Sequence, residues 1–292
     1  MCGITGYIGN VPFSEDKIKL LMLYNESRGK DSTGYYTPIS DIQKSISEPN
    51  VFLSKKIKED ILFIGHCRRA SMGMINLFNA HPFKYSNIVG IHNGHIKEWK
   101  NLLPSEDKSI NISLDSAALI FLLAKYKDPR ILIELPGSVA VLFADTRQNF
   151  LFAFRNKERP LYYSQKKHQT YISSIPFSLQ AIGFENIEEF KDDLIYKILP
   201  DGTMENVSLL YNDEINARLN TDIVAMGGKH KNKKVAFKNE MIKIKINKKD
   251  NSASFKSSIY QESEYIINKE NFNIENVENF NIEKEEMIEE NI

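Results

Sequence analysis

The 292-residue chain is predicted to form an α+β domain, with helices outside β-sheets, followed by a compositionally distinct tail. Predicted strands come first, two helices follow, and a longer series of strands then continues to about residue 212. Beyond residue 212 the chain is dominated by Asn, Lys, Glu and Ile, with no proline after Pro200 and no glycine after Gly228. We therefore expect a domain over residues 1–212 and a tail over residues 213–292 that is disordered or becomes ordered on a partner.

The first predicted elements are a strand over residues 1–9 and a helix. The helix begins after Ser14, a favoured N-cap residue, with acidic residues in its first turn, and it should end near Ser27. A polar loop with two glycines comes next. Further strands are then predicted from short apolar or aromatic runs, over residues 35–37, 61–70 and 88–92.

Two helices and a second series of strands complete the predicted domain. One helix is expected over residues 96–103. Another is expected over residues 115–126, where Leu and Ile repeat at helical spacing and Asp115 occupies the favourable N-terminal position. From Ser138 onward, apolar runs separated by turn residues predict strands over residues 139–144, 150–154, 161–164, 170–173, 194–199 and 204–210, with a short helix over residues 176–182.

Composition restricts the class of protein. The sequence is 42% hydrophobic and contains two cysteines, Cys2 and Cys67, which suits a reducing compartment better than a disulfide framework. The start of the sequence lacks the basic region and the apolar core that are typical of a signal peptide. No apolar run approaches the ~18–20 residues needed to cross a membrane. We therefore expect a cytoplasmic protein that does not associate with membranes.

The formal net charge of +0 conceals two opposed blocks near the C-terminus. Residues 229–249 are rich in lysine, whereas residues 262–292 are rich in glutamate. The lysine block lacks the interleaved aromatic residues that stack on bases, so a nucleic-acid partner is not expected. Four histidines are clustered in the sequence, namely His66, His81, His92 and His95, and His92 and His95 are close enough to bind one metal ion. No second pair of ligands with regular spacing accompanies them, so neither a metal nor a cofactor is expected.

Cys2 is the strongest candidate for chemistry, because removal of Met1 would make it the first residue. It would then carry a thiol nucleophile and a free α-amine, whose reference pKa of about 7.7–8.0 suits a general base near neutral pH. The alternative is that Cys2 is only a small apolar residue at the start of a strand.

Five separated segments, in this order and spacing, resemble class II glutamine amidotransferase domains. The segments are Met1-Cys2-Gly3-Ile4, residues 28–34 (RGKDSTG), residues 65–71 (GHCRRAS), residues 79–82 (NAHP) and residues 91–94 (IHNG). The resemblance extends from Cys2 to about residue 200. It implies an N-terminal nucleophile (Ntn) hydrolase fold, which is a four-layer αββα sandwich, and hydrolysis of L-glutamine to L-glutamate and ammonia.

The resemblance also implies roles for individual residues. Cys2 would attack the side-chain amide of glutamine, and Asn93 and Gly94 would donate hydrogen bonds to the resulting oxyanion. Arg68 would bind the α-carboxylate and Asp115 the α-ammonium group. The matched segments add two substrate-binding candidates, Ser71 and His92. Taken singly, Arg68 could be a surface arginine at a strand end, Asn93-Gly94 a turn, and Asp115 a helix cap.

Two residues depart from the family pattern, since Arg69 replaces an aromatic or leucine and Met72 replaces a polar residue or histidine. Nothing after residue 212 matches the synthase, transferase or ligase domain that accepts ammonia in such proteins. We therefore expect a stand-alone glutaminase that passes ammonia to a separate synthetase or aminotransferase chain. The alternatives are an N-terminal-cysteine amidase of another small amide and a non-catalytic interaction protein with the same fold.

Overall fold

The computed structural model of the protein describes residues 2–104, 111–208, 243–247, 252–256 and 265–267. The chain divides into two units, Met1–Gly228 and Lys229–Ile292. The predicted boundary between residues 212 and 213, and most of the predicted tail, lie outside the described residues. The described part of the second unit is an antiparallel sheet of β14 (Lys243–Asn247), β15 (Ser252–Lys256) and β16 (Tyr265–Ile267). β14 overlaps the lysine-isoleucine alternation, from which a strand over residues 241–246 is expected.

One sheet of the first unit has seven strands in the order β11-β9-β10-β1-β4-β2-β3, and all its pairs are antiparallel. β1 is a central strand, hydrogen-bonded to β10 on one side and β4 on the other. Its strands are β1 (Gly3–Gly9), β2 (Ser32–Thr37), β3 (Asp41–Ser45), β4 (Leu62–Arg68), β9 (Tyr162–Lys166), β10 (Gln169–Ser173) and β11 (Glu188–Glu189).

The second sheet of this unit has six strands in the order β13-β12-β8-β7-β6-β5. Its longest ladder pairs β6 with β7, from Ile88 opposite Asp145 to Ile96 opposite Gly137. Its strands are β5 (Phe83–Tyr85), β6 (Ile88–Ile96), β7 (Gly137–Asp145), β8 (Leu151–Arg155), β12 (Ile195–Ile198) and β13 (Met204–Asn206).

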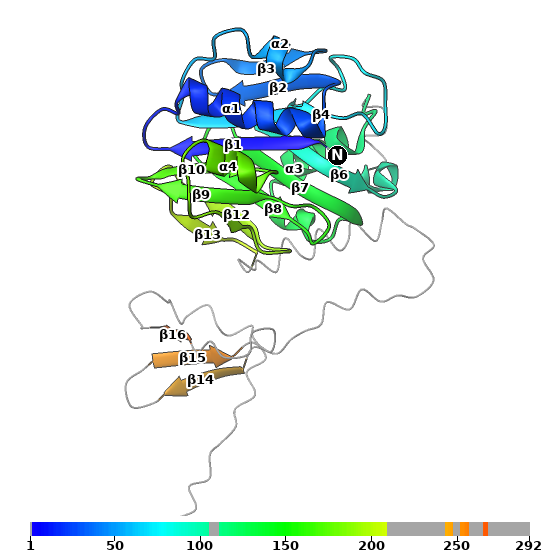
Figure 1. The fold of residues 1–292 in the computed structure, drawn as a ribbon. Coiled ribbons are helices and arrows are strands. Elements are labelled where there is room, and N and C mark those ends of the chain that lie inside the picture. Colours follow the sequence, from blue (N-terminus) through cyan, green and yellow to red (C-terminus); the bar gives the residue numbers. More distant parts are fainter. Residues whose placement is uncertain (1, 105–110, 209–242, 248–251, 257–264, 268–292) are drawn as a thin grey trace, which may run out of the picture. The chain divides into compact units, whose positions relative to one another are not determined.

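Helices cover the outer faces of both sheets (Figure 1). α1 (Glu15–Asn25) and α4 (Pro176–Ala181) pack on the seven-stranded sheet, and α3 (Asp115–Tyr126) packs on the six-stranded sheet. A third apolar cluster fills the space between the sheets. The predicted four-layer αββα sandwich is therefore confirmed. The remaining short elements are α2 (Pro49–Phe52) and the 3₁₀ turns η1 (Glu26–Arg28), η2 (Trp99–Leu102) and η4 (Pro129–Leu132).

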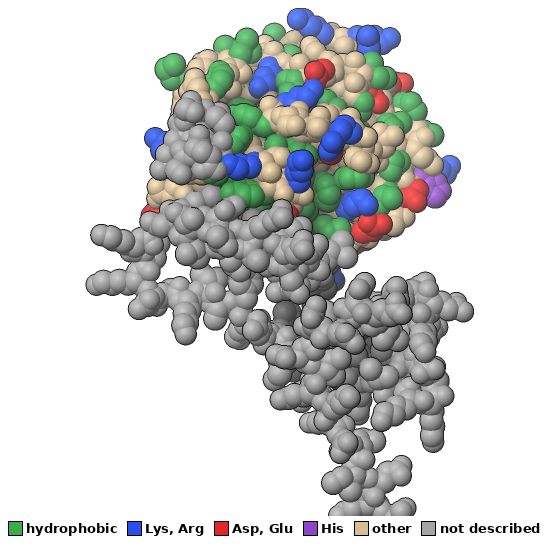
Figure 2. Space-filling view, turned by 180° about the vertical axis from the view of Figure 1, so that it is seen from behind, with side chains coloured by type: hydrophobic (Ala, Val, Ile, Leu, Met, Phe, Trp, Pro, Cys, Tyr) green, Lys and Arg blue, Asp and Glu red, His purple; other side chains and the backbone are tan. Residues whose placement is uncertain are grey.

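On the face in Figure 2, basic and acidic side chains are interspersed with apolar ones. None of the helices within the described ranges is long and apolar enough to span a bilayer.

The structure corrects two local predictions around β6. The helix predicted over residues 96–103 is wrong, since only the 3₁₀ turn η2 forms there. The strand predicted over residues 88–92 continues to Ile96, because β7 pairs with it along its whole length. The helix predicted over residues 115–126 has the expected bounds. Pairing with a distant strand thus overrode the local signal of the Asn93-Gly94 dipeptide.

Candidate active site

Cys2 lies directly before β1, beside the end of β4, where Gly3 pairs with Cys67. The backbone N–H of Arg69 donates to Cys2 Sγ at 3.4 Å, and Sγ lies 3.5 Å from the Arg69 carbonyl oxygen. The backbone N–H of Cys2 donates to Asn93 Oδ1 at 3.3 Å. Because Asn93 belongs to the other sheet, Cys2 joins the two sheets at this point.

Charges around Cys2 oppose the effect of its burial. Burial raises the pKa of the Cys2 thiol, whereas the Arg69 backbone hydrogen bond and the positive charges of Arg68 and Arg28 lower it. Arg28 also holds the residue in place, because its Nε donates to the Cys2 carbonyl oxygen at 2.7 Å. Since the net effect is a raised pKa, the thiol keeps its proton near neutral pH and needs a base before it can attack.

Asn93 and Gly94 lie within β6, opposite Ala140 and Val139, so the alternative that they form a turn is wrong. The Asn93 side chain is buried, and no described residue accepts a hydrogen bond from its Nδ2. Gly94 has a φ of 157°, and a Cβ there would lie 1.8 Å from the Ser138 carbonyl oxygen. Only glycine therefore fits at this position.

Arg68 is the last residue of β4 and is only 3% exposed, so the alternative of a surface arginine is wrong. Its Nη2 donates to the Met72 carbonyl oxygen at 2.6 Å and its Nη1 to that of Met74 at 3.4 Å. Burial lowers the pKa of the guanidinium, while the charges of Cys2, Asp31 and Asp115 raise it. Arg68 thus lies within electrostatic reach of both Cys2 and Asp115, and an arginine stays charged at any physiological pH.

The segment after β4 follows Arg69, whose backbone contacts Cys2, and carries exposed apolar side chains. Ser71 is exposed in this segment, and among the described residues no hydrogen bond joins it to the other predicted site residues. The backbone of the segment is held from within, because Asn79 Nδ2 donates to the Met74 carbonyl oxygen at 2.9 Å. The exposed large apolar side chains, here called the apolar rim, are Met72, Met74, Ile75, Leu77 and Phe78.

Asp115 is the first residue of α3, and its carboxylate links this helix to β6. Its Oδ2 accepts from the Ile96 backbone N–H at 3.0 Å, and its Oδ1 accepts from the Ser116 backbone N–H at 2.8 Å. Asp115 is therefore more than a local helix cap. Ser116 Oγ lies 2.9 Å from His92 Nδ1, so the predicted residue His92 connects to Asp115 through Ser116. His95 Nδ1 lies 3.7 Å from Asp115 Oδ2.

Comparison with known proteins identifies the domain. A family model described as a glutamine amidotransferase domain matches residues 69–181. The glutamine–fructose-6-phosphate aminotransferase (isomerizing) of Sulfurisphaera tokodaii is 32% identical over 227 residues, which are 69% of this chain and 38% of that protein. The chain contains a class II glutamine amidotransferase domain. The same enzyme of Agrobacterium fabrum is 32% identical over 135 residues, which are 43% of this chain and 22% of that protein.

Solved structures show the same fold as the first unit of this chain. The glutamine phosphoribosylpyrophosphate amidotransferase of B. subtilis has a TM-score of 0.59 and 19% identity, covering 71% of this chain and 50% of its own. A structure described as the allosteric regulatory enzyme of purine biosynthesis has a TM-score of 0.58 and 19% identity, and the match covers 71% of this chain and 49% of that chain. These similarities agree with the predicted Ntn-hydrolase fold. The chain spans about two fifths or less of the length of the two aminotransferases described above.

A stacked histidine pair beside the site has no role in the sequence prediction. The His66 ring on β4 and the His81 ring before β5 are 3.9 Å apart between centroids, with an interplanar angle of 29°. Burial lowers the pKa of His66 to about 3 and that of His81 well below its ordinary value. Both rings are therefore neutral at physiological pH. Within the described residues, no group of three or more His, Cys, Asp or Glu side chains could hold a metal ion.

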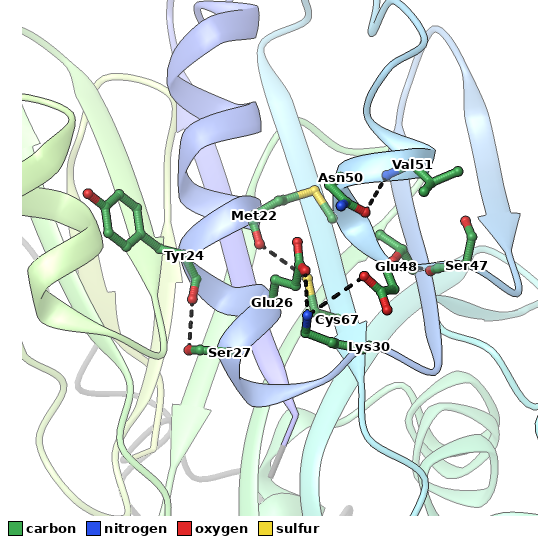
Figure 3. Close-up of polar contacts among 11 residues, drawn as sticks. Met22, Tyr24, Glu26, Ser27, Lys30, Ser47, Glu48, Asn50, Val51 and Cys67 are labelled. Atoms are coloured by element: carbon green, nitrogen blue, oxygen red, sulfur yellow. Dashed lines mark hydrogen bonds and ion pairs between the residues drawn. The ribbon is translucent and has the colours of Figure 1, made fainter.

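Cys67 faces away from this site. Its side chain is fully buried against α1, with Sγ 3.5 Å from the Met22 carbonyl oxygen (Figure 3), and burial strongly raises the pKa of its thiol. On the same side, Lys30 Nζ lies 3.0 Å from Glu26 and 3.7 Å from Glu48. These ion pairs connect the loop after Arg28 to the segment before α2, which helps to fix the turn that carries Arg28.

Proposed function

We propose that the chain hydrolyses L-glutamine to L-glutamate and ammonia through a thioester on Cys2. The observation that carries this proposal is the orientation of the Asn93 amide. Its oxygen accepts from the backbone nitrogen of Cys2, while its buried Nδ2 has no acceptor among the described residues. A hydrogen-bond donor without a partner beside a nucleophile suits an oxyanion that exists only during the reaction.

The proposed reaction begins when removal of Met1 frees the α-amine of Cys2. The amine takes the thiol proton, and Sγ attacks the side-chain carbonyl carbon of glutamine. Asn93 Nδ2 and the Gly94 backbone N–H donate to the oxygen that becomes negative. The C–N bond then breaks, the amine returns its proton to the leaving nitrogen, and ammonia departs. Water attacks the γ-glutamyl thioester, gives a proton back to the thiol by way of the amine, and releases glutamate.

Two charged side chains account for recognition of a free amino acid. Arg68 would bind the α-carboxylate with the guanidinium N–H groups that remain, and Asp115 would accept from the α-ammonium group. His92 is buried and bonded to Ser116, so it would position Asp115 through Ser116 instead of touching the substrate. Ser71 lies at the exposed edge and would contact glutamine only at the entrance.

The ammonia acceptor is proposed to be a separate synthetase or aminotransferase chain. The apolar rim supports a protein contact in the segment that follows Arg69, because concentrated exposed apolar side chains commonly mark such surfaces. In an assay with a co-purified acceptor, Cys2→Ala should abolish glutamine-dependent product formation and leave ammonia-dependent formation intact.

We also propose that residues 1–212 form the amidotransferase domain. Limited proteolysis tests this boundary, and a stable fragment that ends well before residue 212 would contradict it.

The decisive test measures glutamate release from glutamine by the parent protein, Cys2→Ala and Cys67→Ala. We expect no release above background from Cys2→Ala and near-parental release from Cys67→Ala, which removes the thiol on the opposite face of β4. Intact-mass measurement should show that Met1 is absent from active protein. Equal release by the parent and Cys2→Ala would refute the proposal, and a preference for N-acylated amides over glutamine would favour the amidase alternative.

A further inference from the structure

His95 is a titratable side chain at the edge of the site to which the proposed reaction gives no role. It follows Gly94 on β6, and its side chain is 50% exposed, whereas that of Asp115 is 7% exposed. Its Nδ1 lies 3.7 Å from Asp115 Oδ2. The carboxylate that would hold the substrate ammonium group therefore already has a neighbour that becomes a cation when protonated.

The surroundings of His95 restrict which charges act on it. From α3 it faces Asp115, and on its own strand His92 is near enough for the two histidines to repel one another when charged. The positive charge of Arg159 also acts on His92. On β7 the residue paired with His95 is Ser138, which is uncharged. Asp115 is thus the carboxylate in contact with the ring.

A protonated imidazole and a substrate ammonium group would compete for one carboxylate. Both cations are attracted to Asp115, and placing both beside it makes them repel each other. Asp115 already accepts from the Ile96 and Ser116 backbone N–H groups and from the Ser116 hydroxyl, so only about one of its roughly four lone-pair positions remains for a further donor. Glutamine binding should therefore favour neutral His95.

We propose that His95 is a specificity-determining residue that couples recognition of the substrate α-ammonium group to pH, because its protonated ring and that group exclude each other at Asp115. This inference rests on the proposed function, since it assumes that glutamine binds with its ammonium group at Asp115. In its neutral state His95 leaves Asp115 to the substrate. In its protonated state it occupies Asp115 and weakens glutamine binding.

The experiment measures glutamine binding calorimetrically to full-length Cys2→Ala, which cannot turn over, in buffers of different ionisation enthalpy. The dissociation constant for glutamine should rise as the pH falls from 7.5 to 5.5, by at most about tenfold per pH unit, because a single proton excludes the substrate. Protons should be released on binding at pH 6. In the Cys2→Ala background, the further substitution His95→Asn should abolish most of the pH dependence of the dissociation constant and most of the proton release. The control His168→Asn, at the exposed turn between β9 and β10, should leave both quantities unchanged. Glutaramic acid, which is glutamine without its amino group, should bind without releasing protons.

Steady-state kinetics provide the second readout. In the protein with Cys2 intact, His95→Asn should flatten the acid limb of the KM profile and leave kcat at saturating glutamine near the parental value. If glutamine binding releases equal numbers of protons in the parent protein and in His95→Asn, the role of His95 is overturned, whereas the proposed function is not. A protein that neither binds nor hydrolyses glutamine at any pH would overturn both this inference and the proposed function.

Discussion

The two ends of the layer between the sheets differ in polarity, although the same strands build both. Along β4 the residues on this face change from Leu62 and Ile64 to His66 and Arg68, and along β6 Ile91 is followed on the same face by Asn93. The apolar end contains well-packed side chains. The polar end contains buried nitrogen atoms that have no hydrogen-bond partner among the described residues, and groups with shifted pKa values. We infer that the apolar end supplies stability and the polar end supplies the chemistry.

Leu142→Ala should leave a cavity at the apolar end and cause the largest change in the free energy of unfolding. Leu142 is fully buried and lies opposite Gly6 of the other sheet, where an added Cβ would be 2.6 Å from its Cδ1. Truncation should lower the free energy of unfolding by about 2–5 kcal/mol, measured by urea denaturation, and leave kcat near the parental value. Leu77→Ala, at an exposed site of the apolar rim, should change stability by less than about 0.5 kcal/mol. Equal losses in the two variants would contradict the comparison.

Asn93→Ala should remove a catalytic hydrogen-bond donor at the polar end and lower kcat. Loss of one oxyanion donor is expected to lower kcat by about 10²–10³, measured as glutamate release at saturating glutamine. The exposed residue Asn101 in η2 provides the matched control, and Asn101→Ala should retain parental kcat. A kcat within a few-fold of the parent in Asn93→Ala would remove Asn93 from the proposed oxyanion site.

Mild acid should weaken the polar end by a smaller amount. The pKa of His66 is about 3 in the folded protein and about 6.5 when unfolded, so between these values the unfolded chain binds more protons. The free energy of unfolding should therefore fall as pH drops below about 6.5, by about 1.4 kcal/mol per pH unit for this histidine at most.

Urea denaturation at pH 7.5 and pH 5.5 measures this dependence. The pKa of buried His81 is lowered as well, so it should add a contribution in the same direction. His66→Gln should reduce the dependence, whereas His168→Asn should not, because His168 is exposed. Equal pH dependence in the parent and His66→Gln would show that the stacked pair does not carry the effect.

The family resemblance predicted the layers and proposed Cys2, Asn93 and Asp115 as site residues. In the structure Cys2 donates to Asn93 of β6, and Asp115 accepts from Ile96 of the same strand. Sequence reasoning failed where distant pairing decides the structure. The helix expected over residues 96–103 is replaced by the end of β6, since β7 pairs with that strand and Asp115 accepts from the Ile96 backbone N–H.

Sequence analysis assigned no role to the residues that make two further contacts at the site. Arg28 belongs to a segment interpreted as a structural loop, yet its Nε donates to the Cys2 carbonyl oxygen. The stacking of His66 on His81 depends on how the segment before β5 packs on β4. The spacing of these residues along the chain therefore does not reveal either contact.

The Asn93 amide has a consequence for how the protein can change during evolution. Its oxygen accepts from the Cys2 backbone, and its buried nitrogen is the donor proposed for the oxyanion, so a replacement must supply both an acceptor and a donor at the same distance from the backbone. Aspartate lacks the donor when ionised, and glutamine is longer by one methylene. Positions 2 and 93 are therefore expected to be inherited as a unit, and a lineage that loses one of these residues should soon tolerate loss of the other.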